Sequence, residues 1–273
     1  INNIVTKFGI EVSHVSPTDV DEWKAAVKAN TKLLFLETPS NPLGEVADLE
    51  ALAELAHSIG ALLVVDNSLL SPVGSQPLKH GADISVSSAT KAIDGHGRVM
   101  GGVLAGSEEL MTQVAMYCNS CGLAMSPFNA WQLLSGVETL SLRLEKQFDN
   151  ALKIAQWLQA QPQVQAVYYT GLPDHPQAEL IRKQQNGGGI VVGFEVADTD
   201  AAWKIVDSVE LFSRTANLGD VRSTITHPWT TTHGRMQPEE KLAANIRPGL
   251  VRLSVGLEYV DDLIDDLKQA LAR

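Results

Sequence analysis

The chain has 273 residues, 44% of them hydrophobic, with a formal net charge of -11 and an isoelectric point near 5.0. This length is enough for one large domain or two smaller ones, each with its own core. The acidic balance argues against nucleic-acid binding, because no local basic patch offsets its repulsion of phosphate. No apolar run reaches the roughly 18 residues that a membrane-spanning helix needs. We therefore expect a globular cytoplasmic protein without nucleic-acid or membrane partners.

The amino-terminal segment, residues 1–15, begins with Ile1 instead of Met. It lacks the basic region and the apolar stretch of a signal peptide. Its pattern predicts the end of a helix, a turn at Gly9 and then a short strand. We expect that the complete protein extends further toward the amino terminus.

The next part of the chain alternates between strand-like and helix-like segments. Residues 48–59 carry apolar side chains at helical spacing, with Asp48 as a cap and Gly60 as a stop. Continuous apolar runs separated by helices indicate a parallel or mixed sheet that is covered on both faces. The runs that predict strands are residues 32–37, 61–65, 83–87 and 102–105.

The pattern changes after a long helical stretch, which follows Ser126-Pro127 and ends near Gln161-Pro162. We expect a large domain over residues 1–140, which binds a cofactor, and a smaller α/β domain over residues 141–273. In the smaller domain, strands are predicted at 164–170, 189–196 and 251–255, and helices at 199–209 and 258–271.

Two cysteines, Cys118 and Cys121, have the spacing C-x-x-C. Such a pair is compatible with a redox motif or with half of a zinc site. The sequence has no second pair and no histidine cluster nearby, so we favour two ordinary thiols and expect no metal.

Three groups of residues that could take part in catalysis or ligand binding follow successive predicted strands. Asp66 ends the second strand, the sequence S-S-A-T-K at 87–91 follows the third, and a glycine-rich segment at 94–98 comes next. In open α/β folds the carboxyl ends of strands form the ligand-binding edge. These side chains are therefore predicted to meet at one edge of the sheet.

Pyridoxal 5′-phosphate is a cofactor that uses all of these groups. Its aldehyde bonds to a lysine amine, here Lys91, and its ring nitrogen needs a nearby anion, here Asp66. Its phosphate needs several donors, which Ser88 and Thr90 supply, and Asn41 can donate to the ring oxygen.

Each residue also has an ordinary structural interpretation. Aspartates at strand ends are often turn or cap residues, and most lysines are solvated. Serine and threonine in loops often bond only to the backbone. The joint appearance of these residues at successive strand ends favours the cofactor site over the separate structural interpretations.

Several motifs together resemble the Cys/Met metabolism family of pyridoxal-phosphate enzymes. They are N-P at 41–42, V-V-D-N at 64–67, S-A-T-K at 88–91, H-P-W-T-T-T-H at 227–233 and R-L-S-V-G-L-E at 252–258. The resemblance covers essentially the whole chain. It implies an α/β fold of the aspartate-aminotransferase type (fold type I), with a mainly parallel sheet in the large domain, and a homotetramer built from dimers. It also implies that the family's amino-terminal third precedes Ile1.

The resemblance assigns roles to individual residues. Arg252 would bind the substrate α-carboxylate, because its planar guanidinium pairs with a carboxylate through two hydrogen bonds. Asn41 and Ser223 would contribute to the same substrate pocket. The cofactor contacts would come from Lys91, Asp66, Ser88, Thr90, Asn41 and Ser68, with Ser68 close to the ring.

Residues 215–235 are most similar to the O-succinylhomoserine sulfhydrylases within this family. The implied reaction is a γ-replacement in which sulfide displaces succinate and gives homocysteine, a step of methionine biosynthesis. Cystathionine γ-synthase, which uses cysteine as the nucleophile, and a γ-lyase are the alternatives. A hypothesis of a different class is an inactive fragment or scaffold that keeps only the fold.

Overall fold

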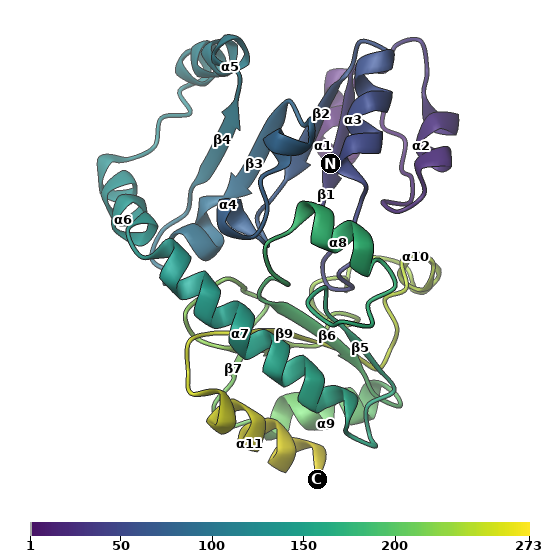
Figure 1. Ribbon diagram of the computed structural model, residues 1–273, viewed down its shortest axis with the longest axis vertical. Coiled ribbons are helices and arrows are strands. Elements are labelled where there is room, and N and C mark those ends of the chain that lie inside the picture. Colours follow the sequence, from purple (N-terminus) through teal and green to yellow (C-terminus); the bar gives the residue numbers. More distant parts are fainter. Residues whose placement is uncertain (1) are drawn as a thin grey trace.

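A computed structural model describes residues 2–273 and arranges them as two β-sheets, one above the other (Figure 1). The first sheet has the strand order β1-β2-β3-β4, in which β1, β2 and β3 are parallel and β4 is antiparallel. Its strands are β1 (Leu33–Glu37), β2 (Leu62–Asp66), β3 (Ile84–Ser88) and β4 (Gly102–Gly106). The strands predicted in this region are confirmed, each to within one residue at either end.

One face of the first sheet packs against α3 (Leu49–Ser58), where leucines of the helix meet Leu34, Leu63 and Val65 of the strands. The predicted cap is confirmed, because the carboxylate of Asp48 accepts a hydrogen bond from the backbone N–H of Ala51. The helix ends before Gly60, whose positive φ of 69° few residues other than glycine adopt.

The opposite face of the first sheet is exposed at its outer strands, β1 and β4, but buried at Val64 of β2 and Ile84 of β3. By strand register, this face carries Leu33 and Phe35 of β1 and Leu104 of β4, which are 50%, 42% and 44% exposed. Within residues 2–273, the prediction of a sheet covered on both faces is confirmed for the face that packs on α3 and holds only in part for the other face.

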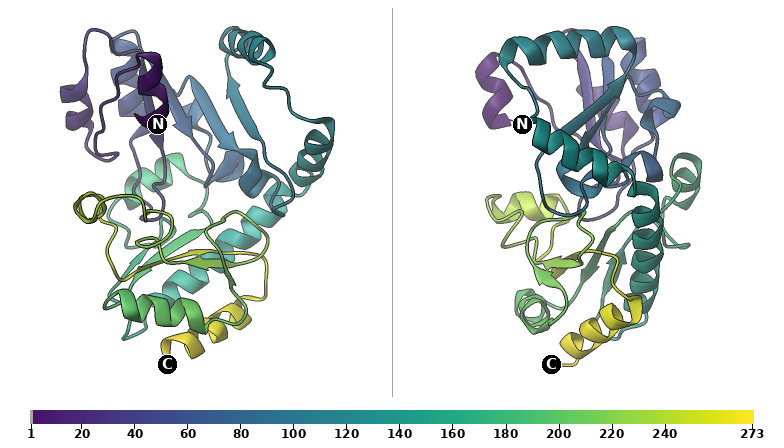
Figure 2. Two further views of the ribbon diagram at one scale, coloured as in Figure 1. Left: turned by 180° about the vertical axis from the view of Figure 1, so that it is seen from behind. Right: turned by 90° about the vertical axis from the view of Figure 1, so that its left-hand side faces the viewer.

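The predicted long helix is in fact two helices, α6 (Pro127–Val137) and α7 (Leu140–Gln159). The chain bends at residues 138–139, and the bend lets both helices contact the segment after β3. Gly136 of α6 packs so closely on the carbonyl of Ile93 that a Cβ would overlap it, while Arg143 of α7 reaches the same carbonyl. Figure 2 shows α6 and α7 linking the two sheets along one side of the molecule.

The second sheet has the strand order β5-β6-β9-β8-β7. Its strands are β5 (Ala166–Tyr168), β6 (Val191–Glu195), β7 (Ser213–Arg214), β8 (Thr224–Thr226) and β9 (Leu250–Ser254). The predicted strands at 164–170, 189–196 and 251–255 correspond to β5, β6 and β9. The short strands β7 and β8 were not predicted, because runs of two or three residues have no measurable alternation.

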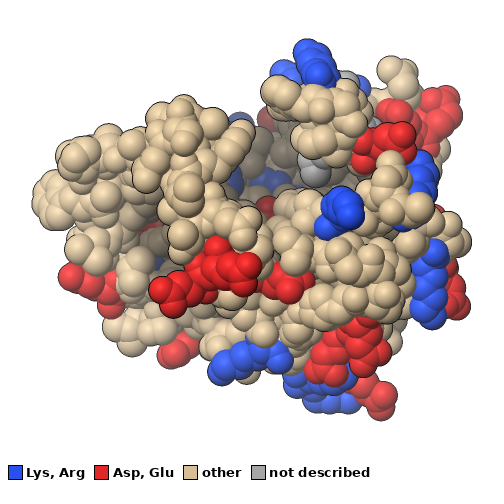
Figure 3. Space-filling view, turned by 90° about the horizontal axis from the view of Figure 1, so that it is seen from above, with Lys and Arg blue, Asp and Glu red and all other residues tan. Residues whose placement is uncertain are grey.

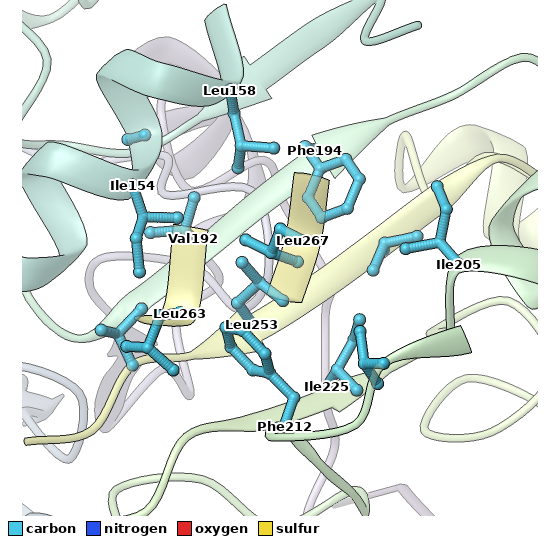
Figure 4. Packing of buried hydrophobic residues seen from close by; sticks show 14 of the residues in the cluster. Ile154, Leu158, Val192, Phe194, Ile205, Phe212, Ile225, Leu253, Leu263 and Leu267 are labelled. Atoms are coloured by element: carbon cyan, nitrogen blue, oxygen red, sulfur yellow. The ribbon is translucent and has the colours of Figure 1, made fainter. Parts of the chain in front are cut away.

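Helices α7, α9 (Thr199–Ser208) and α11 (Val260–Leu271) enclose the main core on one side of the second sheet. Figure 4 shows Ile154 and Leu158 of α7 and Leu263 and Leu267 of α11 converging on Phe194 and its neighbours. The predicted helices at 199–209 and 258–271 are confirmed as α9 and α11.

The amino-terminal prediction is only partly confirmed. Gly9 has a positive φ of 78° and ends the turn Thr6–Phe8, as predicted. The expected strand after it is wrong, because residues 10–15 form no strand. The remaining helices are α1 (Asn2–Val5), α2 (Val20–Ala26), α4 (Ser71–Gly74), α5 (Glu108–Cys121), α8 (Ala178–Gln184) and α10 (Pro238–Ala243), with the single turns η1 (Thr6–Phe8) and η2 (Pro77–His80).

We propose that the boundary between the two predicted domains lies near residue 140, at the start of α7, a helix that joins the core of the second sheet from Ala151 onward. Among residues 2–273, the helices are all too short or too polar to cross a membrane.

Candidate active site

Asp66 stands at the carboxyl end of β2, where it forms a chain of hydrogen bonds with two serines. Its Oδ1 accepts from the backbone N–H of Ser68 at 2.9 Å and from the Ser68 hydroxyl at 2.6 Å. The Ser68 hydroxyl in turn accepts from the backbone N–H of Ser88 at 2.7 Å. Because β2 and β3 are parallel and in register, Asp66 and Ser88 lie on the same exposed face of the sheet. The structure thus brings three of the predicted residues together.

A second carboxylate, Glu37, was missed by the sequence reasoning. It ends β1 and is the direct register partner of Asp66, so the two side chains share a face. Burial of its carboxyl group and the nearby charge of Asp66 raise the pKa of Glu37 to about 7. Glu37 as a whole residue is exposed, but its carboxyl at the strand end is close enough to Asp66 for the two charges to interact. The alternation of the run L-L-F-L-E would have placed Glu37 on this face, had the register been known.

Lys91 lies in η3 (Ala89–Ile93), a single turn of π-helix that follows β3 directly. Its own backbone dihedrals, φ -87° and ψ -127°, depart from the helix. The Nζ donates to the amide oxygen of Asn217 at 3.1 Å. Burial lowers the pKa of Lys91, and the positive charge of Arg252 lowers it further. Both effects favour the neutral amine, which is the form that attacks a carbonyl or accepts a proton.

Arg252 occupies the middle of β9 and is only 2% exposed. Its Nη1 donates to the Asn41 side chain at 3.4 Å, and its Nη2 donates to the carbonyl of Ala216 at 2.7 Å. Its Nε is buried and has no partner within residues 2–273. Burial lowers the pKa of Arg252 to about 10.

No carboxylate pairs with Arg252 among the described residues. Glu258, six residues after Arg252, instead accepts from the backbone N–H and the hydroxyl of Ser223 at 2.7 and 2.8 Å. A buried cation without a counter-charge is costly unless an anion arrives to pair with it. The arrangement is therefore suited to receive an anionic ligand group.

Two side chains that were predicted to contact a ligand, those of Ser223 and Thr90, form hydrogen bonds within the protein instead. The hydroxyl of Ser223 donates to Glu258 and accepts from the N–H of Gly256, so its only proton is already used within the protein. The Thr90 hydroxyl and the backbone of Gly101 bond to each other. Direct substrate or phosphate contact by these side chains stays a prediction. Asn217, six residues before Ser223, is the residue that reaches Lys91.

The glycine-rich segment at 94–98 forms a tight turn around a carboxylate. Asp94 is fully buried and accepts from the backbone N–H groups of His96 and Arg98 and from Arg98 Nε at 2.9 Å. Its hydrogen bonds are thus all used within the turn, which makes it a structural element beside Lys91.

Cys118 and Cys121 lie on α5 as free thiols. The described residues contain no group of three or more His, Cys, Asp or Glu side chains arranged to hold a metal ion.

The residues present fit pyridoxal phosphate. A lysine with a lowered pKa, an aspartate with one oxygen outside its serine contacts, and an arginine with a free buried donor lie around the carboxyl ends of the first sheet. Gly219 packs on the backbone of Lys91 so closely that a Cβ would clash, which keeps the lysine turn and the loop of Asn217 in contact. Figure 3 shows a hollow in the upper face, with basic and acidic side chains at its floor.

The chain is similar to known enzymes that use pyridoxal phosphate. The family model described as "Cys/Met metabolism PLP-dependent enzyme" matches residues 1–272. The chain is 51% identical over 267 residues to O-succinylhomoserine sulfhydrylase of Pseudomonas aeruginosa, covering 97% of the chain and 66% of that protein. It is 41% identical over 273 residues to L-methionine gamma-lyase of Fusobacterium nucleatum, covering 98% of the chain and 69% of that protein.

Among solved structures, the chain is similar to the cystathionine gamma-lyase CalE6 of Micromonospora echinospora. The TM-score is 0.96 at 36% sequence identity, covering 99% of the chain and 72% of that structure. The fold and the site together define an α/β enzyme of fold type I that uses pyridoxal phosphate. The chain belongs to the family of Cys/Met metabolism PLP-dependent enzymes. It spans about two thirds of the length of the curated relatives.

Proposed function

We propose that the full-length protein catalyses a γ-replacement on O-succinylhomoserine, in which sulfide displaces succinate and homocysteine is formed. The observation that supports an amino-acid substrate is the buried, uncompensated Arg252 on the second sheet. Arg252 is close enough to Lys91 to lower the pKa of the lysine. The choice of ester and nucleophile is supported by the identity of 51% to the Pseudomonas aeruginosa sulfhydrylase.

In this proposal each side chain has a defined task. Arg252 and Asn41 bind the α-carboxylate and so orient the α-carbon. The neutral amine of Lys91 takes the α-proton and returns it at the neighbouring carbon. Asn217 holds that amine by its amide oxygen.

The bound cofactor supplies an electron-withdrawing ring, and Asp66 keeps its ring nitrogen protonated. Ser68 fixes the orientation of the Asp66 carboxylate through its two hydrogen bonds. In the overall reaction the γ-carbon–oxygen bond breaks, a γ-carbon–sulfur bond forms, and succinate leaves with the proton released by hydrogen sulfide.

Two related activities are the alternatives. Cystathionine γ-synthase would use cysteine in place of sulfide, and a γ-lyase would eliminate the γ-substituent without replacing it. The similarity to a methionine gamma-lyase and to the CalE6 structure is the reason that the γ-lyase activity is included in the test. A scaffold without activity is disfavoured, because the uncompensated Arg252 and a Lys91 with a lowered pKa have no use in a fold alone.

The deciding experiment is an assay of the full-length protein with O-succinyl- and O-acetylhomoserine, each with sulfide and with cysteine. We expect homocysteine from the succinyl ester with sulfide as the fastest reaction. Cystathionine as the main product would support the synthase, and 2-oxobutanoate without thiol consumption would support a γ-lyase. Absence of product together with absence of a visible cofactor band would support the scaffold.

A further inference from the structure

Helix α7 carries three buried polar side chains, Arg143, Gln147 and Asn150, which we call the α7 polar row. Their spacing of four and three residues places them on one face of the helix. Each donates hydrogen bonds to main-chain carbonyls of other segments. Buried polar groups with fixed partners are costly to disturb, so the row holds those segments rigidly.

Arg143 forms hydrogen bonds to the turn that contains Lys91. Its Nη1 donates to the carbonyl of Ala92 at 2.9 Å, and its Nη2 donates to the carbonyls of Ile93 at 3.2 Å and of Gly136 at 2.7 Å. The side chain is only 5% exposed. The approach is so close that a Cβ at Gly95 would overlap the guanidinium, which explains a glycine with a φ of 67° there.

Gln147, one turn further along α7, joins two other parts of the site. Its Nε2 donates to the carbonyl of Asp220 at 3.0 Å and to the carbonyl of Val255 at 2.8 Å. Asp220 belongs to the loop whose Asn217 holds the Lys91 amine, and Val255 follows the strand of Arg252. Asn150 continues the pattern, with hydrogen bonds to the carbonyls of Gly256 and Glu258 at 3.1 and 3.0 Å.

We propose that the α7 polar row is a positioning element that fixes Lys91 on the first sheet relative to Arg252 on the second. This inference rests on the proposed function, in which Arg252 holds the carboxylate and Lys91 moves the proton of one substrate molecule. The proton transfer depends on the separation of two side chains that belong to different sheets. A misplacement of about 1 Å is enough to slow such a reaction roughly 100-fold.

The test uses two variants of Arg143 in the full-length holoenzyme. Arg143→Gln removes the charge and the guanidinium that contacts three carbonyls, while Arg143→Lys keeps the charge but cannot reach three carbonyls at once. The matched control is Asp266→Asn on α11. Asp266 is similarly buried, at 7% exposed, and accepts from three main-chain N–H groups at 2.8 to 3.1 Å. These groups belong to residues 210–212, directly before β7 of the second sheet.

Three quantities are measured for each variant: the melting temperature, kcat and KM for the ester, and the circular dichroism of the bound cofactor in the resting enzyme. The dichroism reports how firmly the protein orients the cofactor and needs no substrate. We expect Arg143→Gln to lower kcat by about 10- to 100-fold with little change in KM. Its cofactor dichroism should weaken, and Arg143→Lys should lie between it and the wild type.

The control should lose melting temperature while keeping kcat and the cofactor dichroism. The inference is overturned if the Arg143 variants lose only melting temperature, as the control does. If Arg143→Gln does not fold, Arg143→Lys carries the same comparison. If the wild type turns over no homoserine ester, the proposed function fails, whereas the dichroism still tests the positioning of Lys91.

Discussion

Glu37 and Asp66 are two carboxylates on adjacent parallel strands, and their proximity has a measurable effect on pH dependence. Burial, followed by the charge of Asp66, raises the pKa of Glu37 from 4.5 to about 7 in the folded protein. An acid with a raised folded-state pKa binds its proton more tightly in the folded state. Its contribution therefore destabilises the fold as the pH rises from about 4.5 to about 7.

We predict that Glu37→Gln removes this penalty. The variant should gain melting temperature over the wild type at pH 8 and show little or no gain at pH 4, measured by thermal unfolding at both values. Equal differences at the two pH values would contradict the raised pKa of Glu37.

Asp66→Ala tests the anion beside the cofactor ring. The variant should still bind the cofactor, because Lys91 is untouched, but proton abstraction should slow. The loss expected for a preorganised electrostatic group is roughly 2.7–4 kcal/mol in the activation barrier. The measurements are kcat and the visible absorption of the bound cofactor, and near-normal turnover in Asp66→Ala would refute the role.

Arg252 is the residue that separates recognition from chemistry. Arg252→Lys keeps the charge but loses the planar guanidinium, so every amino-acid substrate should bind more weakly while the resting cofactor absorption is unchanged. Arg252→Ala should be worse, by about 2–5 kcal/mol for a carboxylate left without its buried partner. Since no carboxylate pairs with Arg252 among the described residues, melting temperature should not fall in parallel. A fall in stability with unchanged kinetics would instead indicate a structural role.

Borohydride reduction tests the attachment residue directly. After reduction of the full-length holoenzyme, the labelled peptide identified by mass spectrometry should contain Lys91. A label on Lys79, which lies in η2 and serves as the internal comparison, would overturn the whole set of site assignments.

At the scale of elements, sequence reasoning succeeded where a single local pattern decides the outcome. Apolar runs defined β1 to β4, and a cap and a glycine defined α3. It failed at the bend between α6 and α7, because the cause is tertiary: Gly136 and Arg143 both pack on one turn from a different part of the chain. Local spacing carries no information about such a contact.

The candidate site shows the same division. Lys91 and Asp66 were predicted from their residue types and their positions at strand ends, and Arg252 was predicted from the family resemblance. Asn217 was missed and Ser223 preferred, because both lie in one loop and only the folded loop shows which side chain faces Lys91. The α7 polar row was missed because its residues lie among apolar ones in an amphipathic helix.

Gly95→Ala tests the packing of α7 on the lysine turn. A methyl group there would overlap Arg143, and the φ of 67° is unfavourable for alanine, so both effects destabilise the turn. We expect a lower melting temperature and weaker cofactor binding. Gly60→Ala is the control, since it has a similar φ of 69° but open space at the Cβ position. It should lose stability without loss of cofactor affinity, and equal cofactor affinities in the two variants would contradict the packing argument.

At the scale of the whole molecule, a stripe of large apolar side chains lies exposed along α6. The stripe consists of Phe128, Trp131, Leu134 and Val137, which are 51% to 63% exposed. Exposed apolar patches of this kind are characteristic of protein–protein interfaces. We propose that this stripe forms part of a contact between copies of the full-length protein, in keeping with the expected homotetramer.

Trp131→Glu should therefore produce a smaller assembly, measured as molar mass by analytical ultracentrifugation. The control is Gln156→Glu, which adds the same charge at an exposed position of α7 and should leave the mass unchanged. An unchanged mass in both variants would place the contact elsewhere.

The uncompensated charge of Arg252 has a consequence for selectivity. In the proposed function, Arg252 pairs with a carboxylate that every α-amino acid possesses, including the proposed product. It therefore contributes affinity without discrimination, and free amino acids and homocysteine compete with the ester for the same guanidinium. Choice among them must come from groups that contact the γ-substituent. The reaction leaves the α-carboxylate unchanged. A site that recognises its substrate by this group is therefore expected to be inhibited by its product.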